Sequence, residues 1–246
     1  MTHIQDARAA RFSPDDEIKY TTEDLLDFWA KAVPSLHVHP DDAAELAANH
    51  HALTTEAFVG PYMGPVRTAP VVLLTLNGGI SDNSECITAP KVPGAREAMA
   101  DILSGDAPLP EWIGDPTGRV WTTRRLAQFG LSYDAAAPKV AFINLIGYRS
   151  KHGANDMHMA KRLESSRMVR KWAHSTLFPE AREGKRVVVC LRSARAWGLE
   201  PGTKQGAALF APRVNRAGYI HLDVREEVGA AVRRAVFSSI GAPCGQ

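Results

Sequence analysis

Cysteine is scarce in this chain, with three residues in 246, and they lie far apart at positions 86, 190 and 244. Three scattered thiols cannot form a disulfide scaffold or supply the four ligands of a cysteine zinc or iron–sulfur site. Long apolar runs are also missing: the longest, such as 71–74 and 140–143, are strand-sized and fall far short of the roughly 18 residues that cross a bilayer. The first residues lack a basic and then apolar signal segment. We therefore expect a cytoplasmic protein with no membrane span, no metal cluster and no cofactor.

The formal net charge of +2 hides an uneven distribution along the chain. Residues 1–60 hold eleven acidic and four basic side chains, whereas residues 149–195 hold twelve basic and four acidic ones. A basic middle is what a partner such as single- or double-stranded DNA requires, although an ordinary solvated surface has the same composition. We expect residues 1–59 to form an acidic helical extension packed on an α/β domain of residues 60–246.

Three short, continuous apolar runs predict buried strands, at 71–76, 140–146 and 186–191, and a fourth is expected near 207–214 or 219–222. Continuous rather than alternating hydrophobicity indicates burial on both faces, which is typical of parallel strands. Helical patterns surround them, at 20–33, 40–53, 95–103 and 121–129, in a long helix capped by Asn155, after Ser193, and at 225–237. The alternation predicts a three-layer α/β/α sandwich around a central, mainly parallel four-stranded sheet.

Ligands of open parallel sheets bind beyond the carboxyl ends of the strands, so the residues after each run are the candidates for a site. The first run ends in Asn77, Gly78 and Gly79. Glycines allow a sharp turn and the close approach of a ligand, and Asn77 places an amide at the rim. The segment is neither a GxGxxG motif nor a phosphate loop with lysine, which argues against dinucleotide and triphosphate sites.

The second run ends in Asn144, followed by Tyr148, Arg149 and Lys151. A buried Asn144 must bond either the neighbouring backbone or the amide edge of a ligand, and both alternatives are open. Tyr148 offers a stacking face for a base, and Arg149 and Lys151 offer phosphate contacts. The alternative is that all three are surface loop residues with no role in binding.

The last two runs are followed by Arg192 and by a segment with Arg216 and His221. Both arginines are candidate DNA contacts, and His221 is either a catalytic donor or a structural histidine in an apolar context. Trp197 fits the core better than a stacking role. The histidine pairs at 37/39 and 50/51 lack a nearby cysteine or carboxylate pattern, so we expect no metal site.

A family resemblance rests on these strand ends. Residues 74–81, Leu-Thr-Leu-Asn-Gly-Gly-Ile-Ser, resemble the first motif of the uracil-DNA glycosylase superfamily, which reads Gly-Ile-Asn-Pro-Gly-Leu-Ser in the mismatch-specific branch. Asn77 matches the residue that orients the attacking water, and Gly78 and Gly79 would line the base pocket. Gly78 replaces the proline of that motif.

The resemblance continues over about residues 60–237. Residues 142–150, Phe-Ile-Asn-Leu-Ile-Gly-Tyr-Arg-Ser, are similar to the motif in which an Asn reads the flipped base and an Arg lies downstream, at Asn144 and Arg149 here. Residues 187–199 are similar to the third strand and its helix. The family's His-Pro-Ser is replaced by His221-Leu-Asp, or by Asn215-Arg-Ala-Gly if the strand ends earlier.

The resemblance implies a DNA glycosylase that hydrolyses the N-glycosidic bond of a flipped damaged or modified base, with Asn77 and His221 catalytic. It implies that Asn144 and Tyr148 hold the base and that Arg149, Lys151, Arg192 and Arg216 hold DNA. The loss of His-Pro-Ser favours the alternative, a non-catalytic nucleic-acid or nucleotide-binding protein that kept the fold. A third reading is a hydrolase or transferase acting on free nucleosides.

Overall fold

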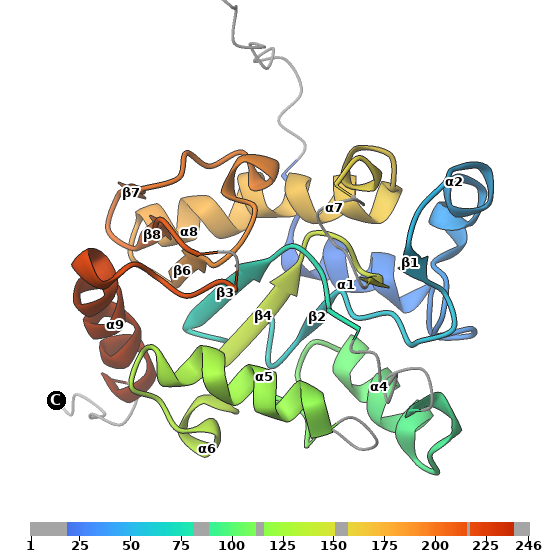
Figure 1. Cartoon of the computed structure of the whole chain (residues 1–246), viewed down its shortest axis with the longest axis horizontal. Coiled ribbons are helices and arrows are strands. Elements are labelled where there is room, and N and C mark those ends of the chain that lie inside the picture. Colours follow the sequence, from blue (N-terminus) through green and yellow to red (C-terminus); the bar gives the residue numbers. More distant parts are fainter. Residues whose placement is uncertain (1–18, 81–88, 112–115, 151–156, 216, 239–246) are drawn as a thin grey trace, which may run out of the picture.

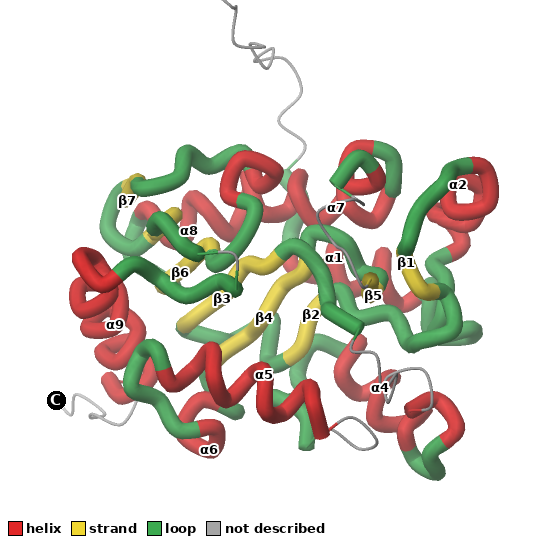
Figure 2. Tube along the Cα trace, viewed as in Figure 1, coloured by secondary structure: helices red, strands yellow, loops and turns green. Residues whose placement is uncertain are grey.

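The computed structural model describes residues 19–80, 89–111, 116–150, 157–215 and 217–238. Within them, six strands form one sheet in the order β2-β4-β3-β6-β8-β7, and β1 and β5 form a separate pair (Figures 1 and 2). The strands are β1 Leu53–Thr54, β2 Tyr62–Met63, β3 Val71–Thr75, β4 Val140–Asn144, β5 Arg149–Ser150, β6 Val187–Cys190, β7 Thr203–Gln205 and β8 Leu209–Ala211. The α-helices are α1 Thr22–Ala30, α2 Ala43–Ala48, α4 Ala95–Leu103, α5 Pro116–Ala127, α6 Tyr133–Ala136, α7 Glu164–Trp172, α8 Phe178–Arg182 and α9 Leu222–Phe237.

The four central strands are parallel, as the continuous apolar runs predict. All five residues of β3 are buried, and β3 pairs in parallel with β4 on one side and β6 on the other. The fourth predicted strand is β8, which pairs in parallel with β6. The alternative position at 219–222 holds no strand: Ile220 makes only an isolated bridge to Val214, and α9 begins at Leu222.

The prediction of a four-stranded sheet is wrong, because an antiparallel strand is added at each edge. The strand β2 pairs with β4, and β7 pairs with β8. Both escape sequence analysis for physical reasons. The two residues of β2 lie in a segment rich in glycine and proline, and β7 is three polar, partly exposed residues at an edge.

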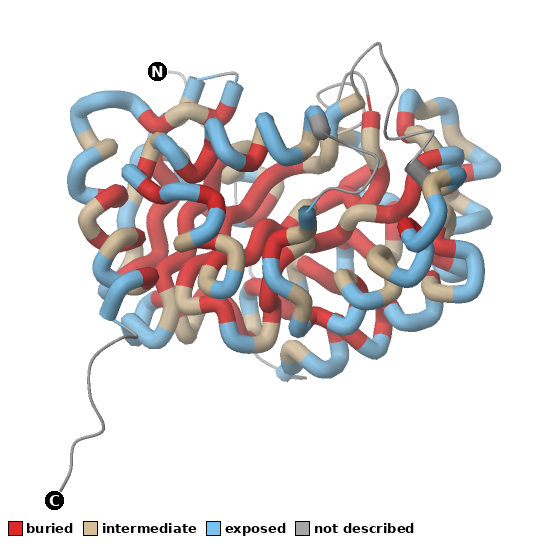
Figure 3. Tube along the Cα trace, turned by 90° about the horizontal axis from the view of Figure 1, so that it is seen from below, coloured by how far each residue is buried: buried red, intermediate tan, exposed pale blue. Residues whose placement is uncertain are grey.

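Helices cover both faces of the sheet. Alternate residues of β3 enter two hydrophobic clusters, Val72 and Leu74 in one and Val71 and Leu73 in the other. The first cluster is completed by α1, α7 and α8, and the second by α5, α6 and α9. Figure 3 shows the buried strands between helices whose outer surfaces are exposed.

Two helix predictions need correction. The long helix expected after Asn155, which lies outside the described residues, is interrupted at its start: a 3₁₀ turn at Met159–Lys161 comes first, and α7, a π-helical turn at Ala173–Leu177 and α8 then follow without a break. The predicted inward face is nevertheless buried, from Met159 to Trp172. Ser193 is no cap: its φ is 58° and its side chain makes no capping bond to the 3₁₀ turn at Ala194–Trp197.

The N-terminal helix packs on the strand ends. Thr21 caps α1 in a capping box with Asp24, which lowers the pKa of that carboxyl through hydrogen bonds from Thr21. Trp29 then reaches the loop after β4, where a Cβ at Gly147 would come within 2.5 Å of its ring. Further on, β1 pairs with β5. The segment before residue 60 therefore braces the loop that carries Arg149.

Candidate functional site

A cavity of about 300 Å³ lies at the carboxyl ends of β3 and β4. Of the residues singled out in the sequence, it brings together five: Asn77, Gly78, Gly79, Asn144 and Arg149. The strands β3 and β4 run in register to Thr75 and Asn144, and bonds from Leu145 N–H to Thr75 O and from Ile146 N–H to Leu76 O extend the pairing beyond the strand ends. The two amide-bearing turns therefore start from the same edge of the sheet.

Asn77 is held from one side only. Its Nδ2 donates to Ser150 Oγ at 2.9 Å, and Ser150 is buried. Ser150 also fixes the turn itself, since its N–H donates to Gly78 O and its carbonyl accepts from Ile80 N–H. Within the described residues, Asn77 Oδ1 has no hydrogen-bond partner, so this oxygen can accept a hydrogen bond from a ligand or a water in the cavity.

The amide of Asn144 has a fixed orientation. Its Nδ2 donates to Gly60 O at 2.6 Å, and its Oδ1 accepts from Thr75 Oγ1. A carbonyl can only accept, so the nitrogen must face Gly60. Of the two alternatives in the sequence, bonding to the neighbouring backbone is therefore present. An amide has two N–H donors and two lone pairs on oxygen, so one donor and one acceptor remain for a ligand.

The glycine turn makes room for an arginine. Neither Gly78 nor Gly79 has a left-handed φ, so backbone freedom is not what this turn requires. A Cβ on Gly78 would lie 3.0 Å from Cγ of Arg149, whereas a Cβ on Gly79 would meet nothing within 4 Å. Arg149 Nη1 lies 3.5 Å from Gly79 O. The missing side chain at Gly78 thus lets Arg149 lie across the turn at the cavity.

The rest of the lining is largely apolar, and none of it was a candidate in the sequence. It comes from the helices and the edge strand: Met63 on β2, Met99 and Ile102 on α4, and Trp121 on α5. Trp121 packs against Phe142 at 5.6 Å between ring centroids. Nothing in the spacing of these apolar residues separates a cavity wall from an ordinary core.

Tyr148 is not at the cavity. Its side chain is 1% exposed, its hydroxyl donates to Asp42 Oδ2 at 2.7 Å, and the hydroxyl accepts from the N–H of His39 at 3.1 Å. Burial and the carboxylate of Asp42 raise the pKa of Tyr148, which keeps the hydroxyl protonated. The structure therefore leaves no ring face exposed for a base and uses Tyr148 to join the N-terminal segment to the core.

The remaining candidates lie elsewhere. His221 is exposed at the start of α9 and does not line the cavity, and its N–H donates to Arg213 O. Arg192 is half-buried just past β6, also outside the cavity lining. Trp197 is fully buried, as expected, and its Nε1 donates to Thr75 O. Lys151 and Arg216 lie outside the described residues.

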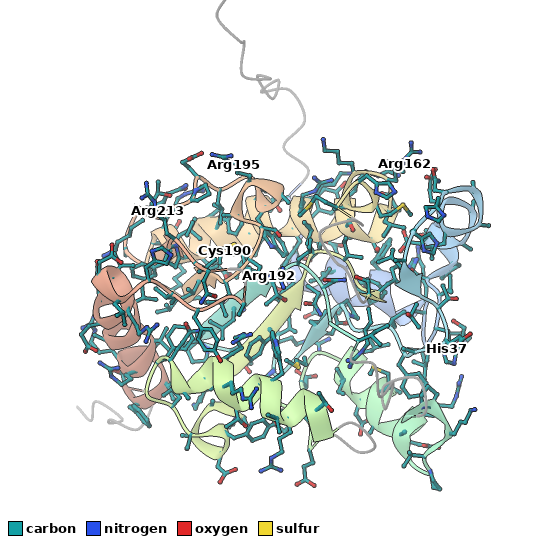
Figure 4. The ribbon with its side chains drawn as sticks, in the orientation of Figure 1. His37, Arg162, Cys190, Arg192, Arg195 and Arg213 are labelled. Atoms are coloured by element: carbon teal, nitrogen blue, oxygen red, sulfur yellow. The ribbon has the colours of Figure 1, made fainter. Side chains whose placement is uncertain are left out.

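The described basic residues of the stretch 149–195 do not gather at the cavity. Figure 4 shows three of its arginines at separate places in the view, with Arg162 and Arg195 at the outer edge and Arg192 closer to the centre. Several basic residues pair with carboxylates, including Arg162 with Glu45 of the acidic N-terminal segment at 3.7 Å. The run of charge in the sequence is thus dispersed by the fold, and Arg149 is its described member at the cavity.

A comparison with protein-family models, curated proteins and solved structures finds no match to this chain. The resemblance to the glycosylase superfamily therefore stays a prediction. Among the described residues, no helix is both long and apolar enough to span a membrane. The same part of the chain contains no group of three or more histidine, cysteine, aspartate or glutamate side chains placed to hold a metal ion.

Proposed function

We propose that the chain is a DNA glycosylase-like enzyme, which binds a base extruded from DNA in the cavity and hydrolyses its N-glycosidic bond. The observation that carries the proposal is the convergence of Asn77 and Asn144 from two strand ends on one cavity. At about 300 Å³ the cavity is at the small end of ligand sites, which suits a single base with its sugar. Its apolar walls, with Trp121 and Phe142, suit an aromatic ring.

In this proposal Asn144 recognises the base and Asn77 positions the attacking water. The fixed amide of Asn144 offers one donor and one acceptor, which complement a base edge with an adjacent carbonyl oxygen and ring N–H. The open oxygen of Asn77 holds a water against C1′ of the sugar. The water oxygen bonds to C1′ as the bond from C1′ to the base nitrogen breaks, and a proton of the water ends on the departing base.

An amide is a poor base, so the rate must come mostly from electrostatics. The departing base carries negative charge and the sugar positive charge in the transition state. Arg149 is the cation of the described lining, and it would stabilise the base anion or a neighbouring phosphate. His221 lies outside the lining, so the proposal assigns it no step.

The test is strand cleavage at abasic sites in oligonucleotides that carry uracil, hypoxanthine, ethenocytosine, thymine mismatches or hypermodified cytosines. We expect product from at least one of them. Asn77→Ala should lower its rate on the order of 10²–10³-fold and leave DNA affinity within about twofold. Asn49→Ala is the control, since the side chain of Asn49 bonds Glu45 at the end of α2 and does not line the cavity. Intact binding without cleavage of any substrate would refute the enzymatic proposal.

The second candidate is a non-catalytic nucleic-acid or nucleotide-binding protein. It is favoured by the described cavity lining, which contains no carboxylate and no histidine, the side chains that most often act as general acid or base. If this candidate is correct, Asn77→Ala and Asn144→Ala both weaken binding of an oligonucleotide with an extruded base, and neither changes its chemistry.

A further inference from the structure

Arg125 is a buried cation that the proposed reaction does not use. It lies on α5, and its side chain is 7% exposed. Its guanidinium is stacked between two rings, 5.1 Å from the centroid of Trp121 and 4.4 Å from that of Tyr219. Such stacking fixes the plane of a guanidinium while leaving the N–H groups at its edge for other partners.

Those N–H groups have no protein partner in the described part of the chain. Nη1 of Arg125 is buried without a hydrogen bond, and no described carboxylate forms an ion pair with it. A buried donor without a partner destabilises the fold, and more so when it is charged. The aromatic rings offset part of the charge but accept none of the N–H bonds. An anion would satisfy both.

Arg125 lies beside the cavity without lining it. Thr117, Gly118 and Trp121 of α5 line the cavity, and Arg125 follows Trp121 by four residues, about 6 Å along the helix axis. On its other side, a Cβ on Gly218 would lie 3.7 Å from Nε of Arg125 and 3.5 Å from Cγ of Arg192. Two arginines therefore converge on a glycine at the end of the sheet that carries the cavity.

We propose that Arg125 binds a phosphate of the nucleic-acid backbone, so that the substrate is a nucleotide within a strand and not a free nucleoside. The inference rests on the proposed function for the base in the cavity. A planar guanidinium can bond two phosphate oxygens at once. With Arg149 at the glycine turn and Arg125 beyond Trp121, the base in the cavity has a cation on either side for the phosphates that flank it.

The experiment measures the affinity of a fluorescent single-stranded oligonucleotide as a function of salt concentration. Each phosphate contact on a single strand contributes about 0.7 to the slope of log K against log[salt]. We expect Arg125→Gln to lower affinity about tenfold and to reduce the slope by about 0.7. The matched control is Arg124→Gln, which removes the same charge from the next, exposed position of α5 and should change affinity less than twofold.

Arg125→Lys separates phosphate binding from a packing role. Lysine keeps the charge, so Arg125→Lys should restore most of the salt slope. If Arg125 only packs between the two rings, the Lys and Gln variants should have the same salt slope. Thermal unfolding of each variant checks that it is folded. Equal slopes for wild type, Arg125→Gln and Arg124→Gln, equivalence of the Lys and Gln variants, or no binding by wild type would overturn the proposal. Binding that depends on Arg125, without base excision, would refute the glycosylase function and leave the phosphate site standing.

Discussion

Replacing Tyr148 with phenylalanine separates a structural role from a base-binding one. The variant keeps the ring and removes the hydroxyl, which donates to Asp42 Oδ2 at 2.7 Å and accepts from His39 N–H at 3.1 Å. Asp42 and His39 are both fully buried, so water cannot replace the lost partner. The other carboxylate oxygen of Asp42 keeps its bond from Ser165 N–H. The change therefore leaves one buried acceptor and one buried donor unsatisfied.

Each such group costs on the order of 1–3 kcal/mol, so the free energy of unfolding should fall by about 3 kcal/mol. For a chain of this length, that corresponds to a Tm lower by about 6–12 °C. Calorimetry measures the shift. Oligonucleotide affinity, measured well below the Tm, should be unchanged because the hydroxyl does not reach the cavity.

The control is Tyr20→Phe, which removes a hydroxyl that accepts a bond from exposed Lys171. It should cost less than about 0.5 kcal/mol. If the Tm of Tyr148→Phe equals that of Tyr20→Phe and wild type, the buried network does not stabilise the fold as argued. If Tyr148→Phe keeps the wild-type Tm but loses oligonucleotide affinity, Tyr148 belongs to the binding site.

Three further predictions concern the turn after β3 and the core. Ser150→Ala frees the amide of Asn77, so turnover should fall about tenfold with little change in affinity, which single-turnover kinetics would separate. Gly78→Ala forces Arg149 to move and should weaken oligonucleotide binding several-fold, whereas Gly79→Ala, with open space around its Cβ, should not; equal effects would contradict the argument. Burial raises the pKa of Cys190 to about 12, so the neutral thiol is favoured in the folded state and its stability contribution is lost as pH rises above about 9. Between about pH 9 and 10, Cys190→Ala should flatten the decline in unfolding free energy by about 1 kcal/mol per pH unit, as measured by urea unfolding.

The sequence predicts the parallel centre of the fold because β3, β4 and β6 are continuous apolar runs, which only burial on both faces explains. It does not predict β2 and β7, whose pairing depends on edges that exist only after the centre has formed. The same contrast holds at the cavity. Asn77 and Asn144 end strands that are neighbours in the sheet, so their meeting follows from the strand pairing.

The other parts of the site depend on tertiary contacts that no local pattern encodes. Tyr148 stands beside Arg149 in the sequence, yet one is buried against Asp42 and the other lines the cavity. Ser150 was not a candidate in the sequence, yet its hydroxyl holds the amide of Asn77. Arg125 sits in a helix with ordinary composition, and its lack of an acidic partner is visible only in three dimensions.

Basic residues that are close together in the sequence need not lie on one face of the folded protein. The twelve basic side chains of 149–195 would steer DNA only if the fold gathered them on one face. Instead, pairs such as Arg162 with Glu45 and Arg186 with Glu180 neutralise part of the run away from the cavity. DNA contact should then depend on a few arginines at the carboxyl edge of the sheet, so the salt dependence of binding should be shallow and most of it should disappear with Arg125 and Arg149. A steep slope that survives both substitutions would place the DNA on a different face of the protein.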